Sequence, residues 1–324
     1  MRILLSVLLL LLFLPSWSGD ERLPLLPEEA HMRARPVTLD PNDPGRVKLG
    51  GLTFLGGVRL TSPAAAFGGF SAMTVAGDRF TLLSDGGNIV SFRMGSDWQP
   101  RAVRFANLPD GPGRGWHKSD RDSESLAVDR ATGQLWVGFE DSNEIWRYAP
   151  GFARAEARSA PAAIREWPES SGAESMVRLR DGSFLLLSEG EPGTAKGTRQ
   201  GLWFAGDPVK PRQRGFRFSY RPPDGFRPTD VTELPDGRLA VLNRKVSLRE
   251  WFTAAVTIVD RRMLRRGRIV TGREVARFAA PVLHDNFEAL AATREGADTV
   301  LWIASDDNRS LLQQSLLLKF RLDE

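Results

Sequence analysis

The chain has 324 residues, 41% of them hydrophobic, so it is long enough to bury a sizeable core in one large all-β domain or two ordinary domains. Its 44 basic and 40 acidic residues give a formal net charge of +4. Because the two signs nearly balance, the charge gives no reason to predict a nucleic-acid partner. The absence of cysteine excludes disulfides, zinc ribbons, iron–sulfur clusters and thiol catalysis.

The N-terminus has the layout of a secretory signal. Arg2 precedes an apolar run over residues 3–14, and the small residues Ser16 and Ser18 follow. The alternative is a membrane anchor, but the run is shorter than the roughly 20 residues that a spanning helix needs. We therefore predict a signal peptide over residues 1–18 and a periplasmic or secreted protein, with no transmembrane segment after signal removal.

A single domain is predicted to follow a short arm. Residues 19–46 are rich in proline and charge, which indicates a linker or an arm laid over the domain. Strand signals begin at Val47, and residues 47–324 are predicted to form one domain. Its first strands, within residues 48–60, are expected to pair with its last strand, residues 316–322, and thereby to hide both sheet edges.

A two-strand hairpin pattern recurs five times, at intervals of about 55 residues. Each copy has an apolar run, a turn that contains glycine and a second apolar run. The copies cover residues 68–87, 121–141, 171–190, 226–245 and 285–308. The interval is slightly above the roughly 40 to 50 residues of common propeller-blade repeats. We therefore predict an all-β fold, a β-propeller with five or six blades of four-stranded antiparallel sheets.

Acidic residues recur at the outer ends of the hairpins. The position that opens the first strand is occupied in turn by Ser71, Glu124, Glu174, Asp230 and Glu288. The position that closes the second strand is occupied by Asp85, Glu140, Glu189, Arg244 and Asp306. Eight of these ten positions are acidic, whereas Asp and Glu together are only 40 of 324 residues. Because hairpin strands are antiparallel, both sets are expected at one rim of a central channel.

A ring of carboxylates at a channel mouth predicts a bound cation. Packed carboxylates repel one another, and burial raises their pKa unless a cation neutralises them. Calcium takes about six to eight oxygen ligands, which suits such a ring. We predict a calcium site formed by Glu124, Glu174, Asp230, Glu288 and Asp306. The alternative is that these acids cap turns or pair with arginines.

Several phrases of the sequence resemble a known family. They include GGFSAM, DSESLAVD, GAESMVRLRDGSFLLLSE, GFRPTDVTELPDGRLAVLNR and DNFEALAATRE. They look like the bacterial phytase-like family, described as having esterase-like activity of phytase, and the resemblance covers residues 51–323. It implies an exported β-propeller that hydrolyses a phosphoric ester or a related ester with the help of calcium. The Asp-rich and NN-x-D-x-R stretches of well-studied propeller phytases are missing, so the resemblance does not imply phytate as the substrate.

Ester hydrolysis by such a site assigns expected roles to individual residues. Glu174 is the candidate that orients the attacking water, and His284, or else His117, is the candidate proton shuttle. The expected substrate-binding residues are Arg227, Arg244, Lys245, Asp85, Glu140 and Glu189. The cations among them could equally serve to offset the carboxylates, and either histidine could be a plain loop residue. The sequence contains no G-x-S-x-G elbow that would indicate a serine hydrolase.

Two other functions stay open. One is a non-catalytic propeller, pinned by calcium, that binds a ligand or a partner over its acidic mouth. The other is a metal-dependent lactonase-like hydrolase. The cations beside the acids favour a small anionic ester as the ligand, and we expect a monomer. Fold alone does not decide between an enzyme and a binding protein.

Overall fold

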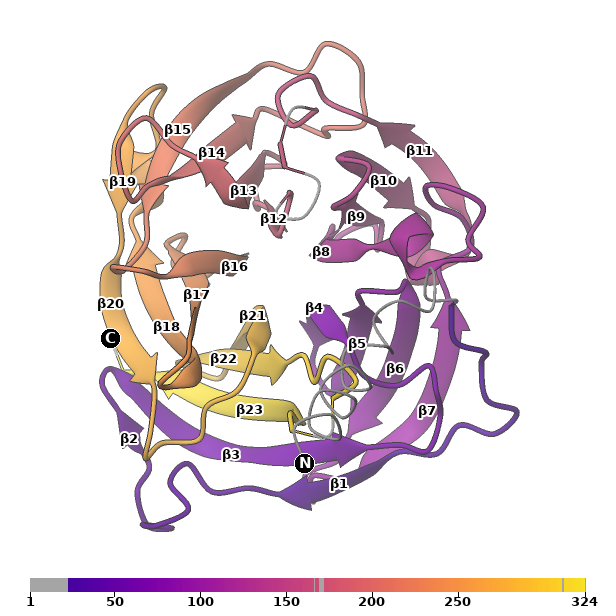
Figure 1. Ribbon diagram of the computed structural model, residues 1–324, viewed down its shortest axis with the longest axis vertical. Coiled ribbons are helices and arrows are strands. Elements are labelled where there is room, and N and C mark those ends of the chain that lie inside the picture. The colour runs from indigo at the N-terminus through magenta and orange to yellow at the C-terminus, as the bar shows by residue number, and fades with distance from the viewer. Residues whose placement is uncertain (1–22, 166, 169–171, 311, 324) are drawn as a thin grey trace, which may run out of the picture.

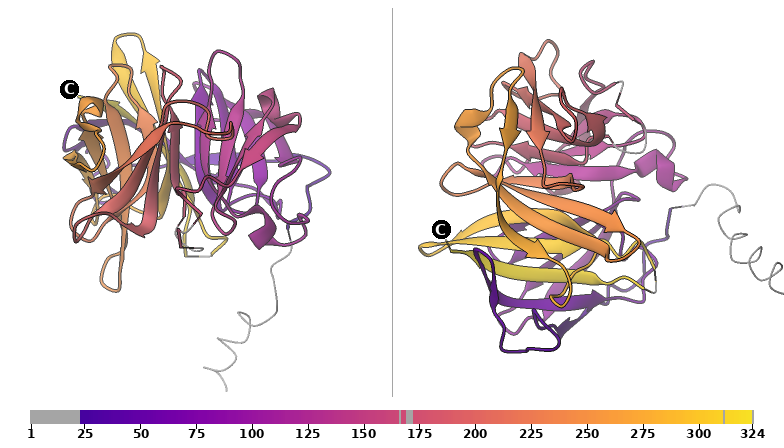
Figure 2. Two further views of the ribbon diagram at one scale, coloured as in Figure 1. Left: turned by 90° about the horizontal axis from the view of Figure 1, so that it is seen from above. Right: turned by 60° about the vertical axis from the view of Figure 1, so that its left-hand side comes forward.

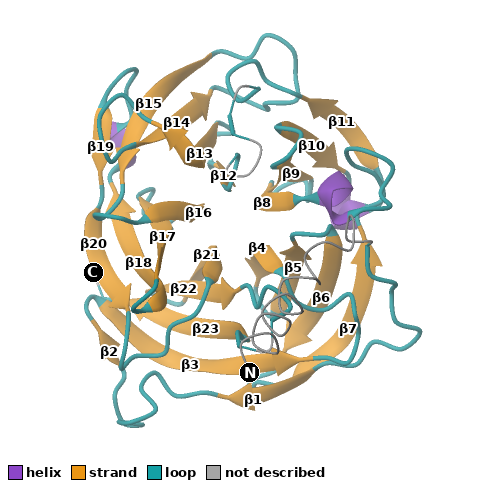
Figure 3. Cartoon of the chain, in the orientation of Figure 1, coloured by secondary structure: helices purple, strands orange, loops and turns teal. Residues whose placement is uncertain are grey.

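The computed structural model describes residues 23–323, apart from residues 166, 169–171 and 311. The predicted signal peptide, residues 1–18, lies outside the described residues. Strands dominate the described chain, which contains short 3₁₀ helices but no α-helix (Figure 3). In this part of the protein, no helix combines the length and the apolar character that crossing a bilayer would require.

Five sheets, antiparallel apart from one parallel strand pair, surround a central axis, and each is one blade of a propeller (Figure 1). The first blade consists of β4 (Phe70–Ala76), β5 (Arg79–Ser84), β6 (Asn88–Met94) and β7 (Pro100–Asn107). The second consists of β8 (Ser123–Val128), β9 (Leu135–Phe139), β10 (Glu144–Tyr148) and β11 (Ala155–Ser159). The fourth consists of β16 (Arg227–Glu233), β17 (Leu239–Ser247), β18 (Trp251–Val259) and β20 (Arg273–Phe278).

The other two blades carry additional strands. The third consists of β12 (Ser175–Arg178), β13 (Phe184–Pro192), β14 (Arg199–Phe204), β15 (Gly215–Arg221) and β19 (Ile269–Thr271). The fifth consists of β21 (Phe287–Glu295), β22 (Asp298–Ser305), β23 (Ser315–Leu322), β3 (Leu52–Thr61), β2 (Lys48–Leu49) and β1 (Arg33–Pro36). Of the two predicted blade numbers, five is therefore the one found in the described chain. Figure 2 shows the same sheets from the side.

The two ends of the chain close the ring together, as predicted. Strand β3 near the N-terminus pairs antiparallel with β23 at the C-terminus, from the pair Leu52 and Leu322 to the pair Leu60 and Ser315. Strand β1 then covers the outer edge of β3. β1 lies inside the segment predicted as an arm, so part of that arm belongs to the fifth sheet. Pairing of this kind removes a sheet edge that would otherwise be exposed.

The third and fourth blades are joined by a crossover. Strand β19 follows β18 in the chain, yet it pairs in parallel with β15 of the preceding blade, where Tyr220 is opposite Val270. The arginine-rich residues before β19 begin with the 3₁₀ helix η4 (Arg261–Met263). Arg261 forms ion pairs with Asp181 of the third blade and Glu233 of the fourth. This segment therefore links two blades.

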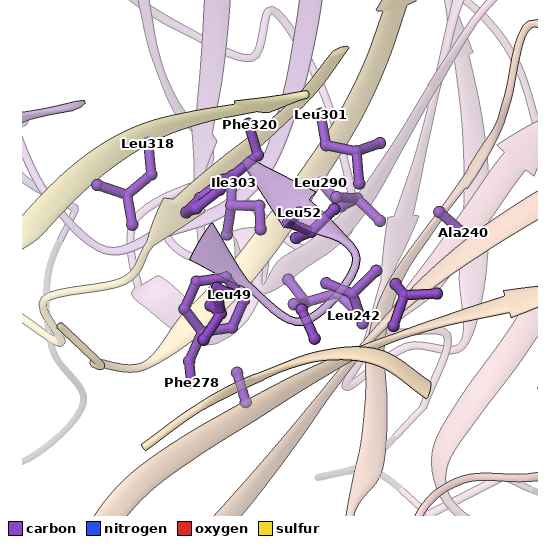
Figure 4. Close-up of a cluster of buried hydrophobic side chains, with 14 of the residues drawn as sticks. Leu49, Leu52, Ala240, Leu242, Phe278, Leu290, Leu301, Ile303, Leu318 and Phe320 are labelled. Atoms are coloured by element: carbon purple, nitrogen blue, oxygen red, sulfur yellow. The ribbon is translucent and has the colours of Figure 1, made fainter. Parts of the chain in front are cut away.

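The core is divided into five clusters, each of which lies between two neighbouring blades. The largest joins the fourth and fifth blades and includes Leu242, Phe278, Ile303 and Phe320 (Figure 4). The rings of Phe278 and Phe320 meet edge to face, with centroids 5.5 Å apart. Each fully buried leucine or phenylalanine contributes roughly 1.5–3 kcal/mol. Packing on both sides of every blade holds the five inner strands, and any site between them, in fixed positions.

Candidate metal centre and active site

The inner strands β4, β8, β12, β16 and β21 surround the axis of the ring (Figure 1). We call the end at which they begin the upper end of the channel. Four of the five carry a β-bulge in their first residues, at Ser71, Glu124, Thr229 and Glu288. A bulge inserts one unpaired residue into a strand and changes the direction of its side chain. In the third blade Glu174 directly precedes the first paired residue, Ser175.

The bulge corrects the predicted alignment of the fourth repeat. Asp230 pairs with Leu242, so the residue equivalent to Glu124 and Glu288 is Thr229. The Thr229 hydroxyl donates to the carbonyl of Phe287 in the next blade at 3.3 Å, as the Ser71 hydroxyl donates to Ser123 at 2.6 Å.

Asp230 consequently lies apart from the predicted calcium ligands. Its carboxylate accepts from the backbone N–H groups of Val231 and Leu290, each at 2.7 Å. Burial raises its pKa. The expected partnership of Asp230 with the glutamates is therefore not found in the structure.

The closing positions Glu140 and Asp306 each lie opposite the residue two before an opening position. The backbone N–H of Glu140 donates to the backbone carbonyl of Asp122 at 2.9 Å, and the N–H of Asp306 donates to the carbonyl of Asn286 at 2.9 Å. Together with one residue that sequence reasoning missed, Asp122, the acids of the upper end form what we call the acidic ring. Its members are Asp85, Asp122, Glu124, Glu140, Glu174, Glu189, Glu288 and Asp306.

The acidic ring contains one set of carboxylates with the spacing of a metal site. Oxygens of Asp122, Glu124 and Glu140 all lie within 4.8 Å of one another. Glu124 is the bulged residue of β8, and Asp122 is opposite Glu140 in the same hairpin. One strand pair thus presents three carboxylates to a single point, and we call this set the acid triad.

Glu174 adds a fourth carboxyl group to the acid triad by sharing a proton with it. Burial raises the pKa of Glu174 well above its ordinary value, and the charges of Glu140 and Glu189 raise it further. Glu174 and Glu140 are hydrogen-bonded to each other, and such a bond between two carboxyl groups needs a proton between them. The backbone N–H of Gly172 donates to the other side of this pair, at Glu140, at 3.2 Å.

Two cations neutralise part of the acidic ring. The Lys118 ammonium lies 2.9 Å from Asp85 and 3.3 Å from Asp122. The Arg244 guanidinium pairs with Glu189 at 2.9 Å and with Glu288 on the opposite side. Eight carboxylates against these two cations leave six formal negative charges if every acid is ionised. The Coulomb cost of this excess must be offset by protons or by a bound cation.

The residues present fit a calcium ion. Calcium prefers carboxylate and carbonyl oxygens, which the acid triad supplies. The Oδ1 atom of Asp85 is buried and has no hydrogen-bond partner among the described residues, so it is available as a further ligand. Burial and the charges of Glu174 and Glu288 raise the pKa of Glu124, so a nearby cation would stabilise its ionised form. The part of the acidic ring around Glu288 already has a cation, because Arg244 pairs with Glu288 there.

The cations predicted to bind the substrate together, Arg227, Arg244 and Lys245, lie in different surroundings. Arg227 is directly opposite Arg244 in the strand pairing and is exposed at the rim. Burial and then the charge of Arg227 lower the pKa of Arg199, while Glu189 raises it. Arg199 was not predicted, and its Nε atom is buried without a partner among the described residues. The rim therefore has two neighbouring guanidinium groups beside Glu189.

Lys245 and His284 do not contact the acidic ring. The Lys245 ammonium lies 5.8 Å from the ring centroid of Phe226, because neighbouring residues of a strand point to opposite faces and Arg244 occupies the inner one. The Nδ1 atom of His284 is 2.7 Å from the carbonyl of Val282. A positive charge on His284 would lower the pKa of its neighbour Asp285. Nothing in these contacts supports a catalytic role for either residue.

The raised carboxyl pKa values predict an unusual pH dependence of stability. Burial is the main cause that raises the pKa of Asp122 to about 6 and that of Glu140 to about 7. The ordinary values are about 4, so between pH 5 and 7 the folded protein holds more protons than the unfolded chain. Stability then falls as pH rises, because its slope follows the protons bound by the unfolded minus the folded state.

We therefore expect the melting temperature of the chelator-treated protein to fall from pH 5 to pH 8. The Glu140→Gln plus Glu174→Gln variant should have a shallower slope, because two of the titrating groups are gone. Carboxylates paired with exposed arginines, such as Asp260 with a pKa of about 2, lose their contribution only below this window. A melting temperature that stays constant or rises with pH would rule out a proton-loaded ring.

Residues 65–309 match a family described as "Phytase-like: Esterase-like activity of phytase". The match covers all five inner strands completely, and it includes every member of the acidic ring. The chain has no match among curated proteins.

Solved structures with a similar arrangement are distant. The chain is similar to the glutaminyl cyclase of Myxococcus xanthus, with a TM-score of 0.49 and 12% identity over 84% of this chain and 96% of that one. It is similar to the WD40 repeats of RRP9 with a TM-score of 0.42 and 10% identity, over 90% of this chain and 100% of that one. With hydrazine synthase of Kuenenia stuttgartiensis the TM-score is 0.37 at 14% identity, over 76% of this chain and 59% of that one. Similarity at this level has no bearing on function.

Proposed function

Because the chain belongs to the phytase-like family, whose described property is esterase-like activity of phytase, we propose that it is a metal-dependent ester hydrolase that acts at the acidic ring. The observation that carries this proposal is the acid triad, whose oxygens lie within 4.8 Å of one another at the mouth of the channel. Asp122, Glu124 and Glu140 would hold the ion. A calcium ion bound there would neutralise these carboxylates and polarise the reacting bond of an ester.

Glu174 is the residue that we assign to proton transfer. It is buried and hydrogen-bonded to Glu140, so it lies at the edge of the proposed ion site. A cation held at Glu140 would favour the ionised form of this pair, and Glu174 would then be a carboxylate. In that state it can accept a proton from an attacking water molecule, the role of a general base. The oxygen of this water bonds to the phosphorus or carbonyl carbon of the ester as the bond to the alcohol oxygen breaks. The proton held by Glu174 then passes to that oxygen, and the alcohol leaves.

Arg199 and Arg227 support an anionic substrate. Two guanidinium groups that lie near each other repel, and an anion between them removes that repulsion. Guanidinium also fits phosphate and carboxylate oxygens in a bidentate arrangement. Arg244, by contrast, is held by Glu189 and Glu288 inside the ring and serves to orient these two acids. We therefore propose a small phosphoric ester or another anionic ester as the substrate.

The remaining features of the proposal concern the whole protein. The basic and apolar start of the sequence supports export to the periplasm or the medium, with a signal over residues 1–18. The arm and the domain that begins at Val47 are proposed as the mature protein, and we propose that it acts as a monomer. A calcium-pinned binding protein and a lactonase-like hydrolase are the alternatives, and the following assay separates them.

The experiment is a panel of phosphomonoesters, phosphodiesters, carboxyl esters and lactones, assayed with calcium and with a chelator. We expect turnover of at least one anionic ester that disappears with the chelator. Glu174→Gln should lower kcat by about 100-fold or more, the usual contribution of a general base. Asp298→Asn, at an exposed acid that begins β22, should leave kcat unchanged. Turnover that ignores the chelator, or a Glu174→Gln enzyme at the wild-type rate, would refute the mechanism. Preferred turnover of lactones would favour the lactonase alternative, and inactivity towards the whole panel the binding protein.

A further inference from the structure

The lower half of the channel contains a separate cavity of about 570 Å³. It is lined by the second halves of all five inner strands, and no member of the acidic ring is among its lining residues in the described chain. Its lining includes the half-buried Val128 and Val177, beside the more deeply buried Val75, Met176 and Val231. Pockets for small organic molecules have volumes of roughly 300–1,000 Å³ and mostly apolar walls. We call this cavity the lower chamber.

The lower chamber has a positively charged mouth. Four arginines line it, whereas the lining carboxyl groups in the described chain are Asp129 and Glu233 at the mouth and the buried Asp230 further inside. Both acids at the mouth are already paired, Asp129 with Arg178 at 3.1 Å and Glu233 with Arg180 at 3.5 Å. The remaining two arginines, Arg130 and Arg294, leave a formal charge of +2, since four cations face two anions. The channel is therefore strongly acidic at its upper end and basic at its lower end.

Arg130 and Arg294 bond only to weak acceptors among the described residues. The Arg130 guanidinium reaches from the second blade across to the fifth, where it donates to the carbonyl of Ala292 at 3.0 Å. The Arg294 guanidinium donates to the carbonyl of Gly296 at 3.3 Å. A charged donor bonds about twice as strongly to an anion as to a neutral acceptor. An anionic group at this mouth would therefore displace the carbonyl partners.

Thr293 and Asp230 are buried polar residues of the chamber lining. Thr293 is only 8% exposed, and its hydroxyl has no hydrogen-bond partner within the described part of the chain. A buried hydroxyl without a partner costs roughly 1–3 kcal/mol, and this oxygen is closed off from the chamber, so a ligand there does not reach it without a change of rotamer. Asp230 also lines the chamber, but both of its oxygens are bonded to backbone N–H groups. Burial raises the pKa of Asp230 and so favours its neutral form, which does not repel an anion.

We propose that the lower chamber is a second ligand site, distinct from the acidic ring, and that it binds a small amphipathic anion. The anionic head would lie between Arg130 and Arg294 at the mouth. The apolar body would lie against the half-buried side chains of Val128 and Val177. Because the two ends of the channel differ in charge, this ligand class is the opposite of the cation proposed for the upper end.

Octanoate is a suitable probe, since it combines a carboxylate with a short apolar chain. Calorimetric titration of the full chain with octanoate is expected to show saturable binding. Acetate has the charge without the apolar body, and octanol has the body without the charge, so both should bind at least tenfold more weakly. Absence of octanoate binding, or equal affinity for all three, would overturn the proposal.

Matched variants locate the site. Arg130→Gln plus Arg294→Gln should weaken octanoate binding at least tenfold, and Thr232→Phe should weaken it by filling the chamber. Arg262→Gln plus Arg266→Gln removes two exposed arginines elsewhere and should have no effect. Glu124→Gln plus Glu140→Gln should also leave octanoate binding intact, so failure of the proposed hydrolase would not affect this result. Binding that survives in both chamber variants would place octanoate elsewhere and refute the proposal.

Discussion

Replacement of Glu124 and Glu140 by glutamine is expected to abolish the stabilisation of the folded protein by calcium. Both side chains belong to the acid triad, and glutamine keeps their shape while it removes two of the negative charges that hold the ion. A ligand at about 100 times its dissociation constant stabilises the folded state by about 2.7 kcal/mol. Urea denaturation with calcium and with a chelator should give this difference for the wild type and a value near zero for the double variant.

Without calcium, the same double variant is expected to lose no stability. The loss of two repelling carboxylates should leave the chelated variant at least as stable as the chelated wild type, because burial raises the pKa of both groups. Asp43→Asn plus Asp298→Asn is the matched control, because it removes two exposed acids outside the ring. An undiminished calcium effect in the Glu124 and Glu140 variant would show that the ion binds elsewhere.

Arg244→Met is expected to destabilise the metal-free protein by about 3–5 kcal/mol, the typical cost of removing one partner of a buried ion pair. The Arg244 side chain is only 17% exposed, and it bonds to Glu189 at 2.9 Å. It also donates to Asn286 at 2.7 Å and pairs with Glu288. Without it, two carboxylates lose their counter-charge. The free energy of unfolding in urea with a chelator at pH 8, where these acids are most ionised, measures the effect.

Rescue distinguishes lost charge from lost packing. Arg244→Met combined with Glu288→Gln should recover part of the stability, because one of the two orphaned charges is removed. Arg93→Met is the control, since Arg93 pairs with Asp78 on the surface with side chains 55% and 46% exposed. Such exposed pairs contribute about 0–1 kcal/mol. If Arg244→Met costs no more than Arg93→Met, the buried network does not stabilise the ring.

The ring closure and the five hairpins could be predicted from the sequence because both depend on local patterns. Alternating apolar runs and turns with glycine define each hairpin, and the unpaired strands at the two ends of the chain require each other. The number of strands in each blade was less predictable. Strand β19 pairs with a blade that precedes it in the chain, and no local signal marks such a crossover.

The candidate site was predicted in outline, and its errors have identifiable causes. Asp230 was aligned by residue type, but the bulge at Thr229 shifts the true register by one residue. Lys245 was grouped with Arg244, although adjacent strand residues face opposite sides. Asp122 could have been found as the cross-strand neighbour of Glu140.

Lys118 had no sequence signal. It lies in the 3₁₀ helix η2 (Lys118–Arg121), within an irregular loop, and only the folded loop brings its ammonium between Asp85 and Asp122. Arg199 is similar, since it lies at the start of β14 and meets Arg227 across the boundary between two blades. Contacts between blades depend on how the sheets pack, which the repeat pattern does not specify.

The most direct measurement is a long-wavelength anomalous difference map from crystals of the protein grown with calcium. We predict a peak at the acid triad, within about 2.3–2.6 Å of carboxylate oxygens of Asp122, Glu124 and Glu140. The peak should be absent in crystals of the Glu124→Gln plus Glu140→Gln variant. A wild-type map with no peak at these three residues, or with calcium bound only elsewhere, would contradict a metal centre in the acidic ring.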